Sequence, residues 1–381
     1  MINIDNKAIF AACLMSSSGA IIYLISPVLI GSAMAHLDLS SDRAGLLIAS
    51  YFSGYTLVTL TAILWLHRCN LQITAWLYTL AFSASLIIGA TSVSPPVAML
   101  TLLIGGAGAG LLYGISITII SQSSDPGRYF GFALAAQLVL GSPLLFAGPA
   151  YISPQWGYSG VLVATAGFVS LMSVATHWAP KTIVAPQTST NSAQPKENRT
   201  IIFTAIAAVM IWFIGYSGIY AFIERIGAAG GLSGYEIGLV LSLTITTGLA
   251  GALGAALMGN RYGNIKPHLI GAVGTTITVL LLLSQPGLVR YALAIITLTL
   301  SMNFWLAYML SSVAAADVSG RYAVLVTAAL GIGATLGPAI AGGIIQSANY
   351  SPMLAAGLLS ILLGSGLIIR ALQRLHLETL L

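Results

Sequence analysis

The chain is a succession of long apolar stretches separated by short polar breaks. Most of these stretches are close to the roughly 20 residues that a helix needs to cross the hydrocarbon core of a bilayer. A transmembrane β-barrel would instead show alternating segments of about ten residues, and the sequence has no such segments. The pattern predicts twelve transmembrane helices, at about residues 8–34, 44–66, 73–92, 97–120, 129–152, 158–178, 200–224, 235–258, 267–285, 289–312, 321–346 and 352–372.

The composition agrees with a protein that has lipid as its solvent. Of 381 residues, 57% are hydrophobic and only 6% are charged, whereas a soluble domain carries about 25% charged residues. The net charge of +5 comes from basic residues that are spread along the chain, so it indicates no nucleic-acid partner. We therefore expect an all-α membrane protein whose partner is the lipid bilayer.

The distribution of Lys and Arg predicts the orientation of the chain in the membrane. If the N-terminus is cytoplasmic, eleven of the 14 basic residues fall on the cytoplasmic side, and only Arg43, Arg225 and Arg290 fall outside. Positive charge concentrates in cytoplasmic loops. Because twelve helices return the chain to its starting side, both termini are expected in the cytoplasm, with the protein in the cytoplasmic (inner) membrane.

Residues 179–199 interrupt the apolar pattern and suggest two domains. This stretch, "APKTIVAPQTSTNSAQPKENR", is rich in polar residues and proline, so it cannot bury a core of its own. We interpret it as a flexible cytoplasmic linker. It would join an N-terminal six-helix bundle, residues 1–178, to a C-terminal six-helix bundle, residues 200–381.

The two predicted bundles contain a similar polar segment at equivalent positions. "SSDPGRYFGF" (123–132) precedes the fifth helix, and "AADVSGRYAV" (315–324) precedes the eleventh. In both, an aspartate that favours a helix N-terminus precedes Gly-Arg-Tyr. The pair reads either as two ordinary helix caps or as an internal repeat, which is common in transporters.

Six plus six helices with a polar central loop resemble the major facilitator superfamily over essentially the whole chain. Members carry a G-x-x-x-D-R-x-G signature after the second helix, and the corresponding stretches here are "ILWLHRCNLQ" (63–72) and "AALMGNRYGN" (255–264). The arginines of the signature are kept, but both copies lack its acidic residue, which in the family latches the cytoplasmic side. The resemblance implies gating residues at Arg68, Asp125, Arg128, Arg261, Asp317 and Arg321.

Glycine-rich helices extend the resemblance toward drug–proton antiporters. The fourth helix keeps Gly106, Gly108 and Gly110 of a family pattern, although Leu102 replaces an arginine that is tied to proton transfer. The eleventh helix, "GIGATLGPAIAGG" (331–343), resembles the Gly-Pro motif that antiporters usually carry in the fifth helix, and the fifth helix here, "LGSPLLFAGPAY" (140–151), is a looser version of it. Close packing of helices explains these glycines equally well.

Other chemistry finds little support in the sequence. "GGAGAG" lies inside an apolar helix, without the preceding strand that a dinucleotide loop requires. A serine in "GYSG" (157–160) would need a histidine within reach, but His177 lies about 27 Å further along the same helix, and His36, His67, His268 and His376 are expected in loops or tails. No residues have metal-ligand spacing. We therefore expect no metal, no cofactor and no enzyme activity, with an intramembrane enzyme as a remote alternative.

Glu224 is the only acidic residue expected to reach into a spanning helix, which makes it the candidate for proton coupling. Trp212, Tyr216 and Tyr220 precede it at intervals of four residues, so they lie roughly on one helix face. Arg225 is adjacent, but neighbouring side chains point about 100° apart, so no pairing is expected. The row either guides an amphipathic or cationic solute or belongs to the belt of aromatic side chains at the membrane–water interface, at the end of the helix. Trp212 and Tyr216 lie too far from the helix end for such a belt.

Further polar and aromatic residues fall on helices that line or border the cavity in the resembled family. They complete the set of candidate substrate-binding residues: Tyr23, Tyr113, Gln137, Trp212, Tyr216, Tyr220, Asn303, Trp305 and Tyr308. Their neutral, aromatic character predicts a small amphipathic or aromatic organic solute as substrate. The expected function is alternating-access transport by a monomer, with proton-coupled export as the leading interpretation and import or uncoupled passage of a neutral solute as the alternative.

Overall fold

The structure is a computed structural model. It describes residues 5–92, 94–123, 126–182, 198–259, 261, 265–283, 286–316, 323–346 and 349–380. Residues 183–197 of the expected linker lie outside this part of the chain, as do Asp125, Asp317 and Arg321. The described residues fall into two compact units, Met1–Thr188 and Ser189–Leu381.

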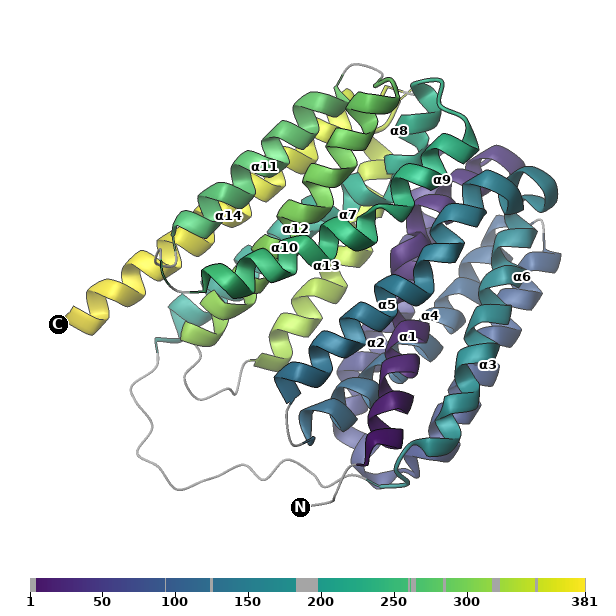
Figure 1. Ribbon diagram of the computed structural model, residues 1–381, viewed down its shortest axis with the longest axis horizontal. Helices are drawn as coiled ribbons and strands as arrows, with labels where there is room; N and C mark the ends of the chain where they lie inside the picture. Colours follow the sequence, from purple (N-terminus) through teal and green to yellow (C-terminus); the bar gives the residue numbers. More distant parts are fainter. Residues whose placement is uncertain are drawn as a thin grey trace. The chain divides into compact units, whose positions relative to one another are not determined.

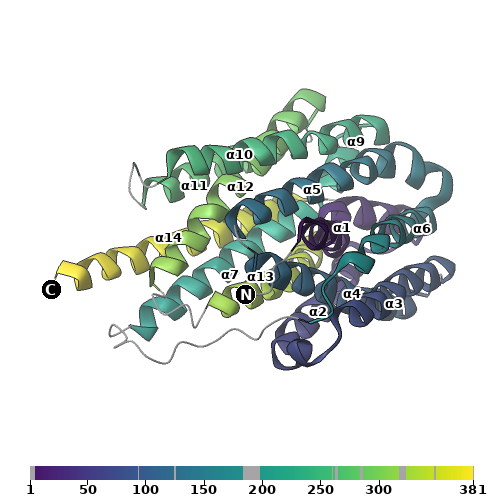
Figure 2. The same cartoon turned by 60° about the horizontal axis from the view of Figure 1, so that its bottom comes forward.

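The described residues of the first unit form six long helices, which are labelled α1 to α6 in Figures 1 and 2. Short 3-10 or π-helical turns extend three of them. In chain order the elements are α1 (Asn6–His36), α2 (Ser41–Trp65), η1 (Leu66–Arg68), α3 (Leu71–Thr91), α4 (Pro95–Ser121), α5 (Pro126–Ala147), η2 (Gly148–Ile152), α6 (Ser153–Ser173) and η3 (Val174–Trp178).

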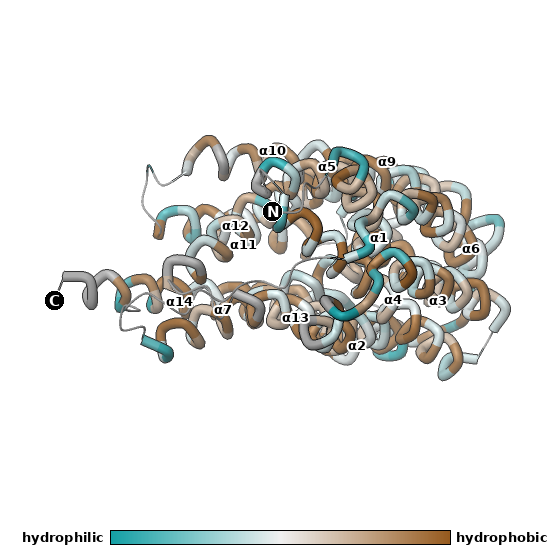
Figure 3. Tube along the Cα trace, turned by 90° about the horizontal axis from the view of Figure 1, so that it is seen from below, coloured by the Kyte–Doolittle hydropathy of each residue, from teal (hydrophilic) through white to brown (hydrophobic). Residues whose placement is uncertain are grey.

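The second unit also contains six apolar helical stretches, one of them broken and another followed by a short helix. Its elements are α7 (Arg199–Ala221), α8 (Ile223–Ala229), α9 (Gly234–Ser242), α10 (Thr244–Met258), α11 (Lys266–Leu282), α12 (Leu288–Ala316), α13 (Ala323–Ile344) and α14 (Ser351–Leu380). Figure 3 shows hydrophobic residues recurring along these helices and along those of the first unit.

The helices confirm the predicted all-α membrane fold. Ten helical stretches of the described chain are long and apolar enough to cross a membrane. One of these stretches, Arg128–Trp178, contains both the fifth and the sixth predicted helices. The ninth predicted helix corresponds to α11, which is apolar but shorter than the ten stretches. Many large apolar side chains remain exposed on both units, including Leu80, Leu171 and Leu257, as expected of surfaces that face lipid.

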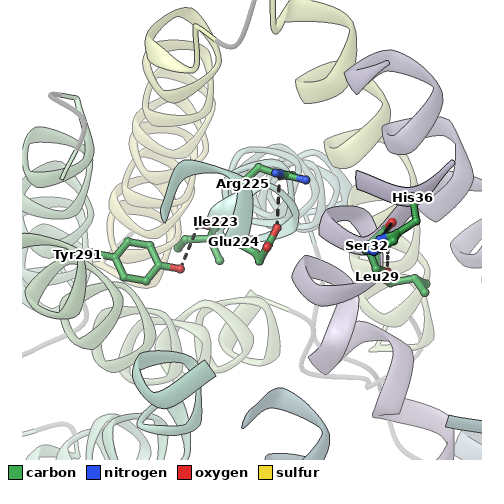
Figure 4. Close-up of polar contacts among 7 residues, drawn as sticks. All are labelled: Leu29, Ser32, His36, Ile223, Glu224, Arg225 and Tyr291. Carbon is green, nitrogen blue, oxygen red and sulfur yellow. Dashed lines mark hydrogen bonds and ion pairs between the residues drawn. The ribbon is translucent and has the colours of Figure 1, made fainter. Parts of the chain in front are cut away.

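The turn between the fifth and sixth helices depends on a glycine. Gly157 has φ +61° inside α6, a conformation that residues with a Cβ rarely adopt. An added Cβ would also lie 3.1 Å from the His36 ring. His36 ends α1 instead of lying in a loop, and its Nδ1 hydrogen-bonds to the Ser32 carbonyl oxygen at 3.1 Å (Figure 4).

The two units repeat one pattern of helix packing. In the first, α1 packs against α4, α5 and α6; α4 also packs against α2 and α3, and α3 packs against α6. In the second, α7 packs against α12, α13 and α14; α12 also packs against α10 and α11, and α11 packs against α14. Replacing each helix of the first unit by the helix six transmembrane segments later reproduces each of the six pairs named for the first unit. This correspondence favours an internal repeat over two coincidental helix caps.

Glycines in α4 allow the helices of the first unit to touch through their backbones. A Cβ added to Gly106 would overlap the carbonyl oxygen of Tyr51 on α2. At Gly108 it would lie 2.8 Å from the Tyr78 carbonyl oxygen on α3. The pattern that resembles a family motif therefore has a packing explanation in this chain, because small residues let membrane helices approach closely.

The Gly-Pro segment of α13 packs in the same way against α7. A Cβ at Gly337 would lie 2.5 Å from the Ile214 carbonyl oxygen. Pro338 lies inside α13, and the Ser217 hydroxyl donates a 2.9 Å hydrogen bond to the carbonyl of Gly333 nearby. A side chain on one helix thus bonds to the backbone of another, one residue before the Ala334 carbonyl that Pro338 leaves without its usual N–H donor.

Candidate functional site

The predicted aromatic row is a continuous stack on α7. The rings of Trp212 and Tyr216 lie 6.0 Å apart with 12° between their planes. Those of Tyr216 and Tyr220 lie 5.9 Å apart at 13°. The three side chains are only 1%, 5% and 4% exposed. An interfacial belt would place these rings at the protein surface, so their burial favours an internal role.

Trp305 on α12 extends the row beyond α7. Its ring meets that of Trp212 edge-on, with centroids 5.5 Å apart and an interplanar angle of 64°. Gly271 on α11 leaves room for the indole, since a Cβ there would overlap the ring. Two helices other than α7 therefore hold the base of the stack in place.

A histidine fixes the orientation of Trp305. The indole Nε1 donates to His268 Nδ1 at 2.8 Å, and His268 Nε2 lies 3.0 Å from Ser312 Oγ. Ser312 donates its hydroxyl proton to the Tyr308 carbonyl at 2.7 Å, so the serine oxygen accepts from the imidazole. Because an indole nitrogen only donates, these bonds require neutral His268 with its proton on Nε2.

This role of His268 was missed by the sequence analysis, which expected the residue in a loop. The structure places it, 0% exposed, in the first turn of α11. Pro267 could have signalled that placement, because proline is common in the first turn of a helix. The partners Trp305 and Ser312 lie 37 and 44 residues away, and sequence spacing does not reveal such a contact.

Replacing His268 with leucine is expected to destabilise the protein by about 1–3 kcal/mol, because the buried Trp305 N–H loses its acceptor. Thermal unfolding of the purified protein in detergent measures the effect. His268→Gln, which retains one acceptor and one donor, should recover most of the loss. Equal melting temperatures for the leucine and glutamine variants would contradict the hydrogen-bond explanation.

Two other candidates on α12 have local partners. The Tyr308 hydroxyl donates to the Gly259 carbonyl at 2.8 Å, at the C-terminal end of α10. The Asn303 amide donates to the Thr299 carbonyl on its own helix at 2.9 Å, and its side chain is half-buried. Tyr308 therefore supports a helix end, whereas Asn303 keeps an acceptor oxygen that could serve a solute.

Glu224 and Arg225 form an ion pair, contrary to the sequence-based expectation. Arg225 Nε lies 3.6 Å from Glu224 Oε2 (Figure 4). Adjacent Cα atoms are only about 3.8 Å apart, so two long side chains can fold toward each other despite their different directions. The expected spanning helix also ends earlier, at Ala221, and Glu224 lies beyond it in the first turn of α8.

The surroundings of Glu224 are buried and aromatic. Its side chain is 13% exposed, and Oε2 has no hydrogen-bond partner in the described part of the chain. Two tyrosines, Tyr291 and Tyr350, lie close enough to interact electrostatically with the carboxylate. The Tyr291 hydroxyl donates a 3.1 Å hydrogen bond to the Ile223 carbonyl (Figure 4). Burial raises the pKa of Glu224 to about 7, against the lowering effect of Arg225. A carboxyl with such a pKa can exchange a proton near neutral pH.

The first unit holds a second aromatic cluster, which includes Tyr23 and Tyr113. Ring centroids lie 6.0 Å apart for Tyr23 and Phe52, 6.4 Å for Phe52 and Tyr55, and 6.1 Å for Tyr55 and Tyr113. Phe52 and Tyr55 on α2 were missed by the sequence analysis, although their i, i+3 spacing places them on one helix face. The cluster joins α1, α2 and α4.

Gln137 on α5 adds a neutral amide to this cluster. Its amide nitrogen donates to Ser16 Oγ on α1, and its side chain interacts with the Tyr113 hydroxyl. The structure thus brings Tyr23, Tyr113 and Gln137 together in the first unit. It brings Trp212, Tyr216, Tyr220 and Trp305 together in the second.

The proposed gating arginines that the structure describes are exposed at helix ends. Arg68 lies in η1 and Arg261 in the turn after α10; the described residues form no ion pair with either. The Arg128 guanidinium lies 5.4 Å from the centre of the Phe132 ring. The expected acidic partners of the cytoplasmic segments, Asp125 and Asp317, lie outside the described residues.

The beginning of the expected linker packs against the first unit. The Leu71 N–H, at the start of α3, donates to the Lys181 carbonyl at 2.9 Å, and the Gln72 side chain donates to the His177 carbonyl. Lys181, near the start of the expected linker, therefore lies beside the N-terminal end of α3. Among the residues that the structure describes, no group of three or more His, Cys, Asp or Glu side chains is arranged to hold a metal ion.

Comparison with known proteins identifies the fold. The sequence profile described as Major Facilitator Superfamily matches residues 9–324, and no curated protein sequence matches. The nucleoside transporter NupG superimposes with a TM-score of 0.73 at 14% identity, over 96% of this chain and 99% of NupG. A D-xylose-proton symporter gives 0.70 at 15% identity, over 94% and 95% of the two chains. An inward-facing bacterial homologue of the human lysosomal transporter Spinster gives 0.69 at 14% identity, over 97% of each.

Proposed function

The chain belongs to the major facilitator superfamily of membrane transporters, and from this premise we propose that it exports a small aromatic or amphipathic organic solute in exchange for protons. The protein is a multi-pass membrane transporter of a small molecule, not an enzyme. The proposal concerns its solute, its direction and its coupling ion. We also infer a cytoplasmic-membrane location, cytoplasmic termini and a monomeric state.

The observation that carries the proposal is the buried stack of Trp212, Tyr216 and Tyr220, followed by Glu224 four residues later. Flat rings in parallel stacks offer faces and edges to another ring, which supports an aromatic solute. Glu224 supplies a carboxyl whose proton affinity suits exchange near neutral pH. Arg225 beside it neutralises the ionised form, so that Glu224 can lose its proton without leaving an isolated buried charge.

Export is favoured by the resemblance of α13 to the Gly-Pro motif of antiporters. Gly337 and Pro338 lie where α13 meets α7, the helix that carries the aromatic row. Proline bends helices, so movement at this contact would reach the row directly. The two moving parts are proposed to be residues 1–178 and 200–381, joined by residues 179–199, with Arg68 and Arg261 as cytoplasmic gating residues.

A second candidate function is the import or uncoupled passage of a neutral organic solute. The cluster of Tyr23, Tyr113 and Gln137 contains hydroxyl and amide groups but no ionisable carboxyl or amine. Such groups recognise neutral hydroxyl or carbonyl groups. The similar structures include a nucleoside transporter and a D-xylose-proton symporter, and nucleosides and D-xylose are neutral, ring-containing compounds.

Accumulation in sealed vesicles under an imposed pH gradient separates these functions. Purified protein is reconstituted, and uptake of radiolabelled tetraphenylphosphonium, adenosine and benzoate is followed with the interior made acidic and then alkaline, at zero membrane potential. An exchanger accumulates its solute on the acidic side, a symporter on the alkaline side, and a facilitator on neither. We expect accumulation of a ring compound on the acidic side. Accumulation on the alkaline side, or equal concentrations on both sides, would reject proton-coupled export.

A further inference from the structure

The two tryptophans at the base of the row differ in their hydrogen bonding. Trp305 donates its indole N–H to His268. Trp212 Nε1 is equally buried but has no hydrogen-bond partner in the described part of the chain. An indole nitrogen cannot accept a hydrogen bond, and a buried donor without an acceptor is unfavourable. The indole N–H of Trp212, a side chain that is 1% exposed, is thus a buried hydrogen-bond donor without an acceptor in the described part of the chain.

Trp212 is closely packed by residues of three helices. Tyr216 stacks on one side at 12°, and Trp305 meets the indole edge-on. On the backbone side, a Cβ added to Gly364 of α14 would lie 2.7 Å from the backbone nitrogen of Trp212, so α14 and α7 are in close contact there. Trp212 is therefore packed against neighbours on α7, α12 and α14.

We propose that the Trp212 indole N–H donates a hydrogen bond to the transported solute and selects ring compounds that carry an acceptor atom. A carbonyl oxygen or an unprotonated ring nitrogen would satisfy the donor, while the rest of the solute contacts the aromatic row. This inference rests on the proposed aromatic solute and narrows it to acceptor-bearing compounds. The nitrogen is closed off from solvent in this structure, so the bond forms in the state of the transport cycle that admits solute.

Trp305 has a different role in this arrangement. Because His268 already accepts its N–H, Trp305 acts as a fixed wall beside Trp212 and offers no donor to a solute. The contrast between the two residues gives the experiment a matched control. Both can be changed to phenylalanine, which preserves an aromatic ring and removes the N–H, but only the change at Trp212 removes an unused donor.

The test compares the affinity of pairs of probes with nearly the same shape. Acetophenone and α-methylstyrene differ by a carbonyl in place of a methylene, and quinoline and naphthalene differ by one ring nitrogen. We expect the wild-type protein to bind the acceptor-bearing member about tenfold more tightly, the effect of one net hydrogen bond. Trp212→Phe should abolish this preference, so that both members of a pair bind with about equal affinity. Trp305→Phe should leave the preference at about tenfold. Dissociation constants are measured by ligand-dependent thermal shifts in detergent.

If Trp212→Phe does not fold, an NMR measurement on the wild-type protein still tests the proposal. Quinoline, but not naphthalene, should move one indole N–H resonance downfield in the NMR spectrum, and the same shift should persist in Trp305→Phe. Absence of this shift would overturn the proposal, as would an unchanged preference in a folded Trp212→Phe protein. If both members of each pair bind equally, only this inference fails. If no ring compound binds, the proposed aromatic solute fails with it.

Discussion

Replacing Glu224 with glutamine is expected to abolish accumulation of solute against its gradient while leaving downhill flux intact. Glutamine has nearly the same shape as glutamic acid but cannot exchange a proton. If Glu224 carries the coupled proton, the variant should reach only equal concentrations on both sides of the vesicle under an imposed pH gradient. Solute binding should change little, because the aromatic row is unaltered.

Glu236 provides a matched control for this substitution. Its carboxylate lies exposed at the start of α9, where it accepts a 2.8 Å hydrogen bond from the Ser233 N–H in a capping box. Glutamine can serve the same cap, so Glu236→Gln should accumulate solute as the wild-type protein does. Full accumulation with unchanged pH dependence in Glu224→Gln would contradict the proposed role of Glu224.

The pKa of Glu224 also predicts a pH-dependent difference in stability. The pKa is raised from 4.5 to about 7 in the folded protein, so the folded state binds a proton more tightly than the unfolded state. Stability is then lost as pH rises through this window. Glutamine does not titrate, so the melting temperature of Glu224→Gln relative to wild type should increase between pH 5 and pH 8. A constant difference would show that the carboxyl ionises normally.

The second large effect is expected at Gly106, in the contact between α4 and α2. Because a Cβ there would overlap the Tyr51 carbonyl oxygen, Gly106→Ala requires the two helix backbones to separate. Such overpacking costs about 1–3 kcal/mol or more. Since α4 also packs against α1 and α3, we expect the upper end of this range and a marked fall in melting temperature.

Gly114, two turns later on the same helix, gives the matched control. A Cβ there has no atom within 4 Å, so Gly114→Ala should stabilise the helix by about 0.4–1 kcal/mol through the lower entropy of the unfolded chain. Thermal unfolding of the two variants in one detergent makes the comparison. Similar melting temperatures for both would contradict the close backbone contact at Gly106.

The fold could be predicted because hydropathy directly reports which segments lie in lipid. All twelve predicted apolar runs correspond to helices, and the run from 158 starts next to the break at Gly157. The sequence did not predict the break at Phe222 between α7 and α8, because Ala221, Phe222 and Ile223 continue the apolar run without a helix-ending residue. The predicted run from residue 267 agrees with the start of α11 at Lys266, but His268 was wrongly expected in a loop.

The sequence predicted which site residues share a face of one helix, but it did not predict the contacts between residues on different helices. The spacing of Trp212, Tyr216 and Tyr220 alone placed them in a row. The hydrogen bond between His268 and Trp305 depends on how α11 packs against α12, and the ring contact of Phe52 with Tyr23 depends on how α2 lies beside α1. Such contacts depend on tertiary packing, which cannot be read from the spacing of residues in a single sequence.

The most direct test of the account records proton and solute movement together in sealed vesicles that contain the purified protein. A ring compound that stabilises the protein is added outside, without an imposed gradient, and a trapped pH-sensitive dye reports the interior. Entry of the solute should drive protons out in wild-type vesicles and raise the internal pH, with no pH change in Glu224→Gln vesicles. Solute entry without proton movement in the wild-type protein would contradict coupling and leave a facilitator.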